Sequence, residues 1–208
     1  NKNGLVGGLS WGDKSFQHVI LFRSYDSNFP TDHGNPFSSK SNFSNEKGLY
    51  YGLKIRLAKS LIADAYFDTY RHPGPRYFEK LPTTGAEQYL RLTYSPKNNI
   101  YRLKLHHKGY DQQMKIEEFN QIYRTERYTV TTDWTHKISR SMRNKIGIEY
   151  SSQLIPEIEQ LKDGVVFYDC LIYRQSFVES ITQVSIFSSQ VNHYVYEYTL
   201  DNWQESTP

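Results

Sequence analysis

Histidine and acidic side chains are the residues of this sequence with the most direct catalytic or metal-binding chemistry. His106 and His107 are adjacent. Adjacent side chains of a β-strand point to opposite faces, so these two imidazoles cannot chelate one metal ion together. A zinc site would need further ligands in suitable geometry, and the neighbouring sequence offers none. We therefore predict no metal site and no cofactor, and we expect both histidines to be partly exposed strand residues.

A second set of Asp and His residues falls on or near segments that we expect to be long loops. They are Asp26, Asp32, His33, His72 and Asp111. Such groups form a hydrolase site when they converge, but the sequence does not show that they do. Loop residues of these types are usually only solvated, so we predict that the chain is not an enzyme.

Basic residues recur at alternate positions of three segments and form the main candidate binding row. They are Lys54, Arg56, Arg91, Arg102 and Lys104. A row of cations in an enclosed space attracts anionic solutes, sugars or phosphates by focusing the electric field. Alternatively, these cations pair with acidic residues of neighbouring strands, namely Asp64, Asp68, Glu87 and Glu149, and only stabilise a polar wall. The sequence leaves both interpretations open.

Nucleic-acid binding is not predicted. The net charge of +3 is mild and its positive and negative residues are interspersed. Tyrosine and arginine are interleaved at 123–128, as in surfaces that stack bases, but Glu126 and the nearby Glu117 and Glu118 dilute the positive field. We interpret this segment as the outer end of a strand.

The composition favours a fold with a thin apolar coat. Apolar residues make up only 38% of the 208 residues, yet aromatic residues reach 15%, with 18 tyrosines. Disordered chains are poor in aromatic residues, and tyrosine suits places where apolar surface meets water. No stretch approaches the roughly 18 consecutive apolar residues of a membrane helix. With Cys170 as the one cysteine, no intramolecular disulfide and no cysteine-based zinc site is possible.

Strict alternation of apolar and polar residues identifies the elements that must position these side chains. In 48–57, Leu49, Tyr51 and Leu53 alternate with Tyr50, Gly52 and Lys54. Such alternation would scatter apolar residues around a helix, so it predicts β-strands. Clear alternation identifies five strands: 48–57, 86–94, 100–108, 127–137 and 145–150. We expect about ten in total, because 4–11, 16–25, 61–70, 165–173 and 181–198 are rich in β-forming residues although their alternation is less clean or mixed on both faces.

The connections between these strands alternate in length. Short ones at 12–15, 58–60, 96–99, 139–142 and 176–179 follow every odd strand, and long ones at 29–47, 71–85, 109–122 and 152–164 follow every even strand. Bacterial outer-membrane barrels have short turns at one end and long loops at the other. Backbone groups in lipid must all be paired, so such a sheet has to close. Tyrosines at strand ends predict an aromatic girdle: Tyr50, Tyr51, Tyr70, Tyr94, Tyr101 and Tyr150.

Several short motifs resemble one family. They are Arg23-Ser24-Tyr25, Asn35-Pro36-Phe37, the NEKGLYYG and AYFD segments at 45–52 and 65–68, and Arg76-Tyr77 after a Pro-rich loop. In this order they resemble the large outer-membrane barrels of Bacteroidota and relatives whose N-terminal region carries helix-hairpin-helix repeats. The resemblance covers the first half of the chain best. It implies a barrel with more strands than this sequence holds. The repeats and a terminal strand ending in an aromatic residue are missing here, so a role that depends on them does not carry over.

The sequence therefore predicts an all-β fold, an antiparallel up-and-down transmembrane β-barrel. Residues 1–208 would form a single barrel region that is incomplete at both ends. We expect a non-enzymatic, porin-like protein of the bacterial outer membrane, acting as a channel, a receptor-like surface or an envelope scaffold. Its partners would be outer-membrane lipid, other envelope proteins and anionic solutes. The alternatives are a soluble antiparallel barrel or sandwich that binds a ligand or carbohydrate, and an outer-membrane barrel hydrolase.

Overall fold

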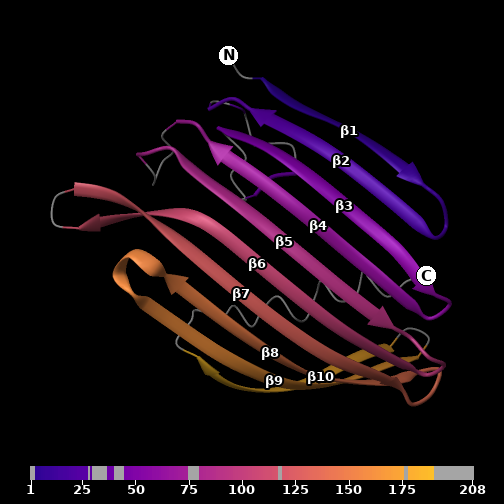
Figure 1. The fold of residues 1–208 in the computed structure, drawn as a ribbon. Coiled ribbons are helices and arrows are strands. Elements are labelled where there is room, and N and C mark those ends of the chain that lie inside the picture. Colours follow the sequence, from indigo (N-terminus) through magenta and orange to yellow (C-terminus); the bar gives the residue numbers. More distant parts are fainter. Residues whose placement is uncertain are drawn as a thin grey trace.

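The described structure is one antiparallel sheet in which strand order follows the sequence. The computed structural model describes residues 3–27, 29, 37–39, 45–74, 80–116, 119–175 and 178–189, and Figure 1 shows the fold. The strands are β1 (Gly4–Gly12), β2 (Phe16–Tyr25), β3 (Glu46–Ala58), β4 (Leu61–His72), β5 (Thr83–Tyr94), β6 (Asn99–Ile116), β7 (Phe119–Lys137), β8 (Met142–Ile155), β9 (Gln160–Gln175) and β10 (Val178–Ser189). Each strand pairs with the next in the chain. This confirms the predicted antiparallel up-and-down sheet.

Helix is nearly absent from the part of the chain that the structure describes. A single 3-10 turn, η1 (Pro156–Ile158), connects β8 to β9. None of the described residues belongs to a helix with the length and apolar character needed to cross a membrane.

The register assigns every strand residue to one of two faces. Leu53, Ala65, Leu90, Leu105 and Val130 are successive partners across five strands and form one row of the apolar face. The row beside it on the opposite face runs through Lys54, Asp64, Arg91, Lys104 and Thr131. We call these the outer face and the inner face. Because side chains alternate along a strand, this register separates apolar from charged residues over most of the sheet.

Burial on the two faces is the reverse of that in a soluble globular protein. On the outer face Leu49, Ile148 and Phe167 are 44–48% exposed. On the inner face Glu46 and Asp133 are 0% and 4% exposed. The sheet curves from β1 to β10 (Figure 1). The inner face is the concave one, since its polar side chains crowd and bury one another while the apolar side chains spread apart.

The strands are longer than alternation alone predicts. The long connection expected at 109–122 is wrong, because β6 continues to Ile116 and β7 starts at Phe119. The one expected at 152–164 is shorter, because β8 continues to Ile155 and β9 starts at Gln160. The end of hairpin β6–β7 extends beyond the ends of β3, β4 and β5 (Figure 1). Outside an apolar band both faces of a hairpin can be polar, so these ends carry no alternation.

The short connections contain the expected turn chemistry. Asp13 accepts hydrogen bonds through Oδ1 from the backbone N–H groups of Ser15 and Phe16, at 2.6 and 2.9 Å. Lys97 has a φ of 47° in the tight connection between β5 and β6. These turns fix the register of the hairpins that they join.

Candidate functional site

All five residues of the predicted basic row lie on the inner face. Lys54, Arg91 and Lys104 belong to one register row, and Arg56 and Arg102 belong to the next. The structure therefore brings together cations from β3, β5 and β6. Whether they bind a solute stays a prediction.

The cations of this row divide into paired and unpaired groups. Arg91 Nε lies 3.2 Å from Asp64 Oδ2, and Arg102 Nη1 lies 3.2 Å from Asp133 Oδ1. In the described part of the chain, Lys54, Arg56 and Lys104 have no carboxylate within salt-bridge distance. Pairing with a carboxylate of a neighbouring strand thus describes Arg91 and Arg102, and attraction of a solute by the other three cations stays a prediction.

Positive charge exceeds negative charge on this part of the inner face. The next register row adds Lys145, which is 7% exposed and lies with Nζ 5.3 Å from the centroid of the Tyr168 ring. Among the described residues of the three rows, six cations thus face three carboxylates, those of Asp64, Asp133 and Glu149. Asp133 Oδ2 is buried and has no hydrogen-bond partner within the described residues.

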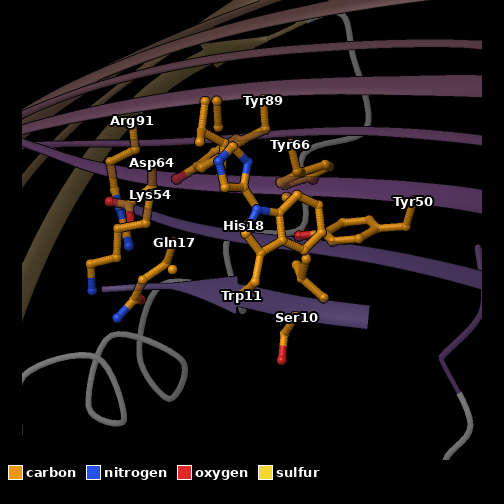
Figure 2. A pocket seen from close by; sticks show the side chains of 15 residues that line it. Ser10, Trp11, Gln17, His18, Tyr50, Lys54, Asp64, Tyr66, Tyr89 and Arg91 are labelled. Carbon is orange, nitrogen blue, oxygen red and sulfur yellow. The ribbon is translucent and has the colours of Figure 1, made fainter. Parts of the chain in front are cut away.

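A groove of about 830 Å³ is lined by residues of β1 to β5. Lys54, Asp64 and Arg91 gather at one end of this groove, away from Tyr50 and the other tyrosines (Figure 2). The ring of Tyr66 stacks on those of Tyr50 and Tyr89, with centroids 5.5 and 5.1 Å apart. This groove combines aromatic surface with fixed charges of both signs.

The residues of the predicted aromatic girdle lie on both faces of the sheet. Tyr94 and Tyr101 lie on the outer face beside the short connection between β5 and β6, with ring centroids 6.1 Å apart. Trp134 continues this stack at 6.4 Å, and its Nε1 donates a hydrogen bond to Asn99 Oδ1 at 3.0 Å. Trp134 was not among the predicted girdle residues, although its place in the alternating segment 127–137 already assigned it to the apolar face.

The other four tyrosines divide between the faces. The register places Tyr51 and Tyr150 on the outer face, in the rows of Ile20 and Val130. Tyr50 and Tyr70 lie on the inner face, and Tyr70 is only 5% exposed. A girdle contacts lipid, so these two do not fit it. Their place near a strand end suggested the girdle, but alternation decides the face.

A buried ionic cluster on the inner face was not foreseen. Arg23 Nε donates to Glu46 Oε1 at 2.5 Å, and its Nη1 and Nη2 donate to the two carboxylate oxygens of Asp68 at 2.7 and 3.0 Å. Glu46 Oε2 also lies 3.3 Å from His72 Nε2, and His72 Nδ1 lies 3.3 Å from Thr83 Oγ1. All five residues are less than a tenth exposed. The cluster ties β2, β3, β4 and β5 together.

The same cluster holds part of the connection between β2 and β3 over the inner face. Glu46 accepts hydrogen bonds from the hydroxyls of Ser38 and Ser39, at 2.8 and 2.6 Å. The Phe37 ring packs against Tyr50, and the Arg23 guanidinium lies 4.9 Å from its centroid. Residues 37–39 therefore cover the inner wall of β2 to β4 and narrow the space in front of it.

The histidine and aspartate candidates within the described residues are divided between the two faces and do not form one site. His106 contacts Glu87 on the inner face at 2.9 Å, and His107 contacts Glu126 on the outer face at 2.6 Å, so the pair does point to opposite faces. His72 is buried on the inner face, whereas Asp111 is on the outer face beside Arg124. Asp26 accepts from the backbone N–H of Asn3.

Asp32 and His33 lie outside the described residues. No group of three or more His, Cys, Asp or Glu within the described ranges could hold a metal ion. The segment 123–128 is divided between the faces, with Arg124 pairing outward to Asp111 and Glu126 at 3.3 and 2.9 Å.

Comparison with known proteins supports the fold. No family model matches the chain, and no curated protein matches it. The resemblance to the barrels with helix-hairpin-helix repeats thus stays a prediction. The fold is similar to the solved structure of OmpT, an outer membrane protein of Vibrio cholerae folded in vitro, in its trimer form. The TM-score is 0.65 at 13% identity, and the match covers 88% of this chain but 54% of that chain, so this chain spans about half the length of OmpT. By its strand order, its register and this likeness, the chain has the fold of an outer-membrane β-barrel protein.

Proposed function

We propose that this chain forms part of the wall of a non-enzymatic channel in the bacterial outer membrane, with an interior that favours anions. One observation carries the proposal: over most of the sheet the outer face carries exposed apolar side chains, such as Leu49, Ile148 and Phe167, while the inner face buries charged ones, such as Arg23, Glu46 and Asp133. A soluble sheet buries its apolar face as a core and leaves its charged face in water. The arrangement here suits lipid outside and an enclosed polar space inside.

The channel needs more wall than the ten described strands. Among the described residues β1 and β10 form the two edges of the sheet and do not pair with each other. An edge exposed to lipid would leave backbone groups unpaired at several kcal/mol each. The match to about half of OmpT fits a larger barrel. We propose that further strands close it.

Anion preference follows from the charges of the inner face. Six cations against three carboxylates, with Lys54, Arg56 and Lys104 unpaired within the described residues, leave a positive field along the wall. Low-dielectric walls focus such a field and raise the local concentration of counter-ions. Receptor and scaffold roles use external surfaces and would not need this excess.

Labelling of single cysteines tests the placement of the two faces. The natural Cys170 is buried on the inner face, so Cys170→Ser supplies the background. Cysteines at Leu53, Ile55, Leu92 and Leu103 should react with or be quenched by lipid-soluble reagents. Cysteines at Lys54, Arg56, Arg91 and Arg102 should respond only to water-soluble ones. Equal access of both sets to water-soluble reagents would mean a soluble protein.

Ion selectivity in planar bilayers tests the channel itself. The double variant Lys54→Glu/Arg56→Glu reverses two unpaired cations, so the ratio of chloride to potassium permeability should fall. Lys97→Glu/Arg140→Glu makes the same change of charge in the exposed short connections after β5 and β7 and should leave the ratio unchanged. A wild-type protein that inserts but conducts no ions would overturn the channel and leave the membrane fold standing.

A further inference from the structure

Two cations face each other on the outer face at the end of β3 and β4. Lys47 and Arg71 are direct partners in the register, and both are exposed. Directly opposed residues of an antiparallel pair have Cβ atoms about 4.5–5.5 Å apart, and like charges there destabilise the sheet. Neither side chain has a carboxylate or other polar partner among the described residues. The sequence thus places an uncompensated double positive charge at one point of the outer face.

This pair marks the limit of the apolar surface. Along the two strands, the next residues that face outward are Leu49 and Thr69, and the ones after them are Tyr51 and Phe67. The cations therefore border the apolar rows directly. They lie at the strand ends that the longer connections join, away from the short turns such as 59–60.

The excess of positive charge is local to β3 and β4. The same outward row continues through Thr84 on β5 to Asp111 on β6 and Arg124 on β7. There Arg124 is neutralised by Asp111 and Glu126, and Asp111 also accepts from the backbone N–H and the hydroxyl of Thr84 at 2.8 Å. The cation of β7 at this end of the sheet is thus paired with carboxylates, whereas Lys47 and Arg71 have no such pairing within the described residues.

We propose that Lys47 and Arg71 bind the phosphate of an anionic lipid of the outer leaflet, whose acyl chains lie along Leu49 and Phe67. A phosphate between the two side chains turns their repulsion into attraction. A guanidinium binds two phosphate oxygens at once, and an ammonium adds a compact point charge. The apolar residues below the pair favour a phosphate that carries hydrocarbon over a free one. The inference rests on the proposed membrane location, with the long connections outside.

Fluorescence quenching next to the pair tests this site. The reporter is Leu49→Trp in a background in which Trp11, Trp134 and Trp203 are replaced by Phe. The protein is inserted in phosphatidylcholine bilayers containing brominated phosphatidylglycerol, and the same experiment is repeated with brominated phosphatidylcholine. A basic residue near an anionic lipid surface contributes about 1 kcal/mol, which is about a five-fold preference. We expect the anionic lipid to be preferred at the reporter by about five-fold or more.

Two variants decide whether the pair is responsible. Arg71→Glu places opposite charges at the paired positions and should remove the preference while leaving insertion intact. Lys162→Glu makes the same change of charge on the inner face of β9 and should keep the preference. A preference that survives Arg71→Glu, or that added inorganic phosphate abolishes at constant ionic strength, would overturn the lipid site. A reporter that neither lipid quenches would instead overturn the membrane location itself.

Discussion

Replacement of Arg23 by alanine tests the claim that the inner face is held by buried charges. The guanidinium makes three hydrogen bonds to Glu46 and Asp68, at 2.5–3.0 Å. Arg23→Ala leaves two carboxylates that are 0% and 7% exposed without their cation. The cavity also removes the contact of the guanidinium with Phe37.

The size of the effect follows from burial. Removing one partner of a buried ion pair costs about 3–5 kcal/mol, because the remaining charge stays desolvated. Arg91 supplies the matched control, since it pairs with Asp64 on the same face at 3.2 Å but both side chains are 21% exposed. Solvent screening reduces such a pair to about 0–1 kcal/mol. Both variants should lower the free energy of unfolding, and the loss for Arg23→Ala should exceed the loss for Arg91→Ala by about 2 kcal/mol or more.

Urea unfolding in lipid vesicles, followed by circular dichroism and by the gel shift of heated samples, measures both values. Adding Glu46→Gln and Asp68→Asn to Arg23→Ala should restore part of the loss, because the unpaired charges are then gone. Equal destabilisation by Arg23→Ala and Arg91→Ala would refute the reasoning. It would mean that water reaches Arg23 and that the inner wall is looser than the geometry shows.

Two other pairs of substitutions test the faces and the packing. Leu105→Arg on the outer face should lower the free energy of unfolding by about 2–4 kcal/mol in the same assay, as cations at mid-bilayer do. Thr93→Arg on the inner face should lower it by less than about 1 kcal/mol. Similar losses for the two variants would contradict the assignment of faces. A Cβ added at Gly85 would lie 2.4 Å from the buried Tyr70 ring, so Gly85→Ala should cost about 1–3 kcal/mol. At Gly109 the nearest atoms are the flexible ends of Arg124 and Glu126, so Gly109→Ala should leave the free energy of unfolding nearly unchanged. A larger loss for Gly109→Ala than for Gly85→Ala would show that the ring of Tyr70 moves aside at little cost.

Alternation predicted the sheet well where each strand separates apolar from polar residues. The strand expected at 16–25 has the observed bounds of β2, and the one at 48–57 falls within β3. The periodicity works in 48–57 because one face is apolar and the other contains charges, and a shift of one residue would exchange them. The segment 16–25 is mixed on both faces and was expected from its β-rich composition. The same rule correctly placed Lys54 and Arg91 on one face, although they are 37 positions apart and on different hairpins.

Contacts that depend on curvature could not be predicted. Nothing in the pattern of β2 distinguishes Arg23 from an exposed arginine, because its burial comes from Glu46 and Asp68 meeting it on the concave side. The length of β6 and β7 was missed for the opposite reason, since Asp111 and Arg124 pair where no apolar row is needed. Tyr50 and Tyr70 show that a position near a strand end does not determine whether a ring meets lipid.

The Glu46 carboxylate binds both the sheet and the connection between β2 and β3, and this limits which sequence changes the connection tolerates. Surface connections normally tolerate insertions and exchange of residues with little effect on the scaffold that they join. Here the oxygens that hold Ser38 and Ser39 also hold Arg23 and His72. Evolutionary change at the stem of this connection is therefore tied to the integrity of four strands. New specificities are more easily acquired by altering the parts of the connection that make no contact with this carboxylate.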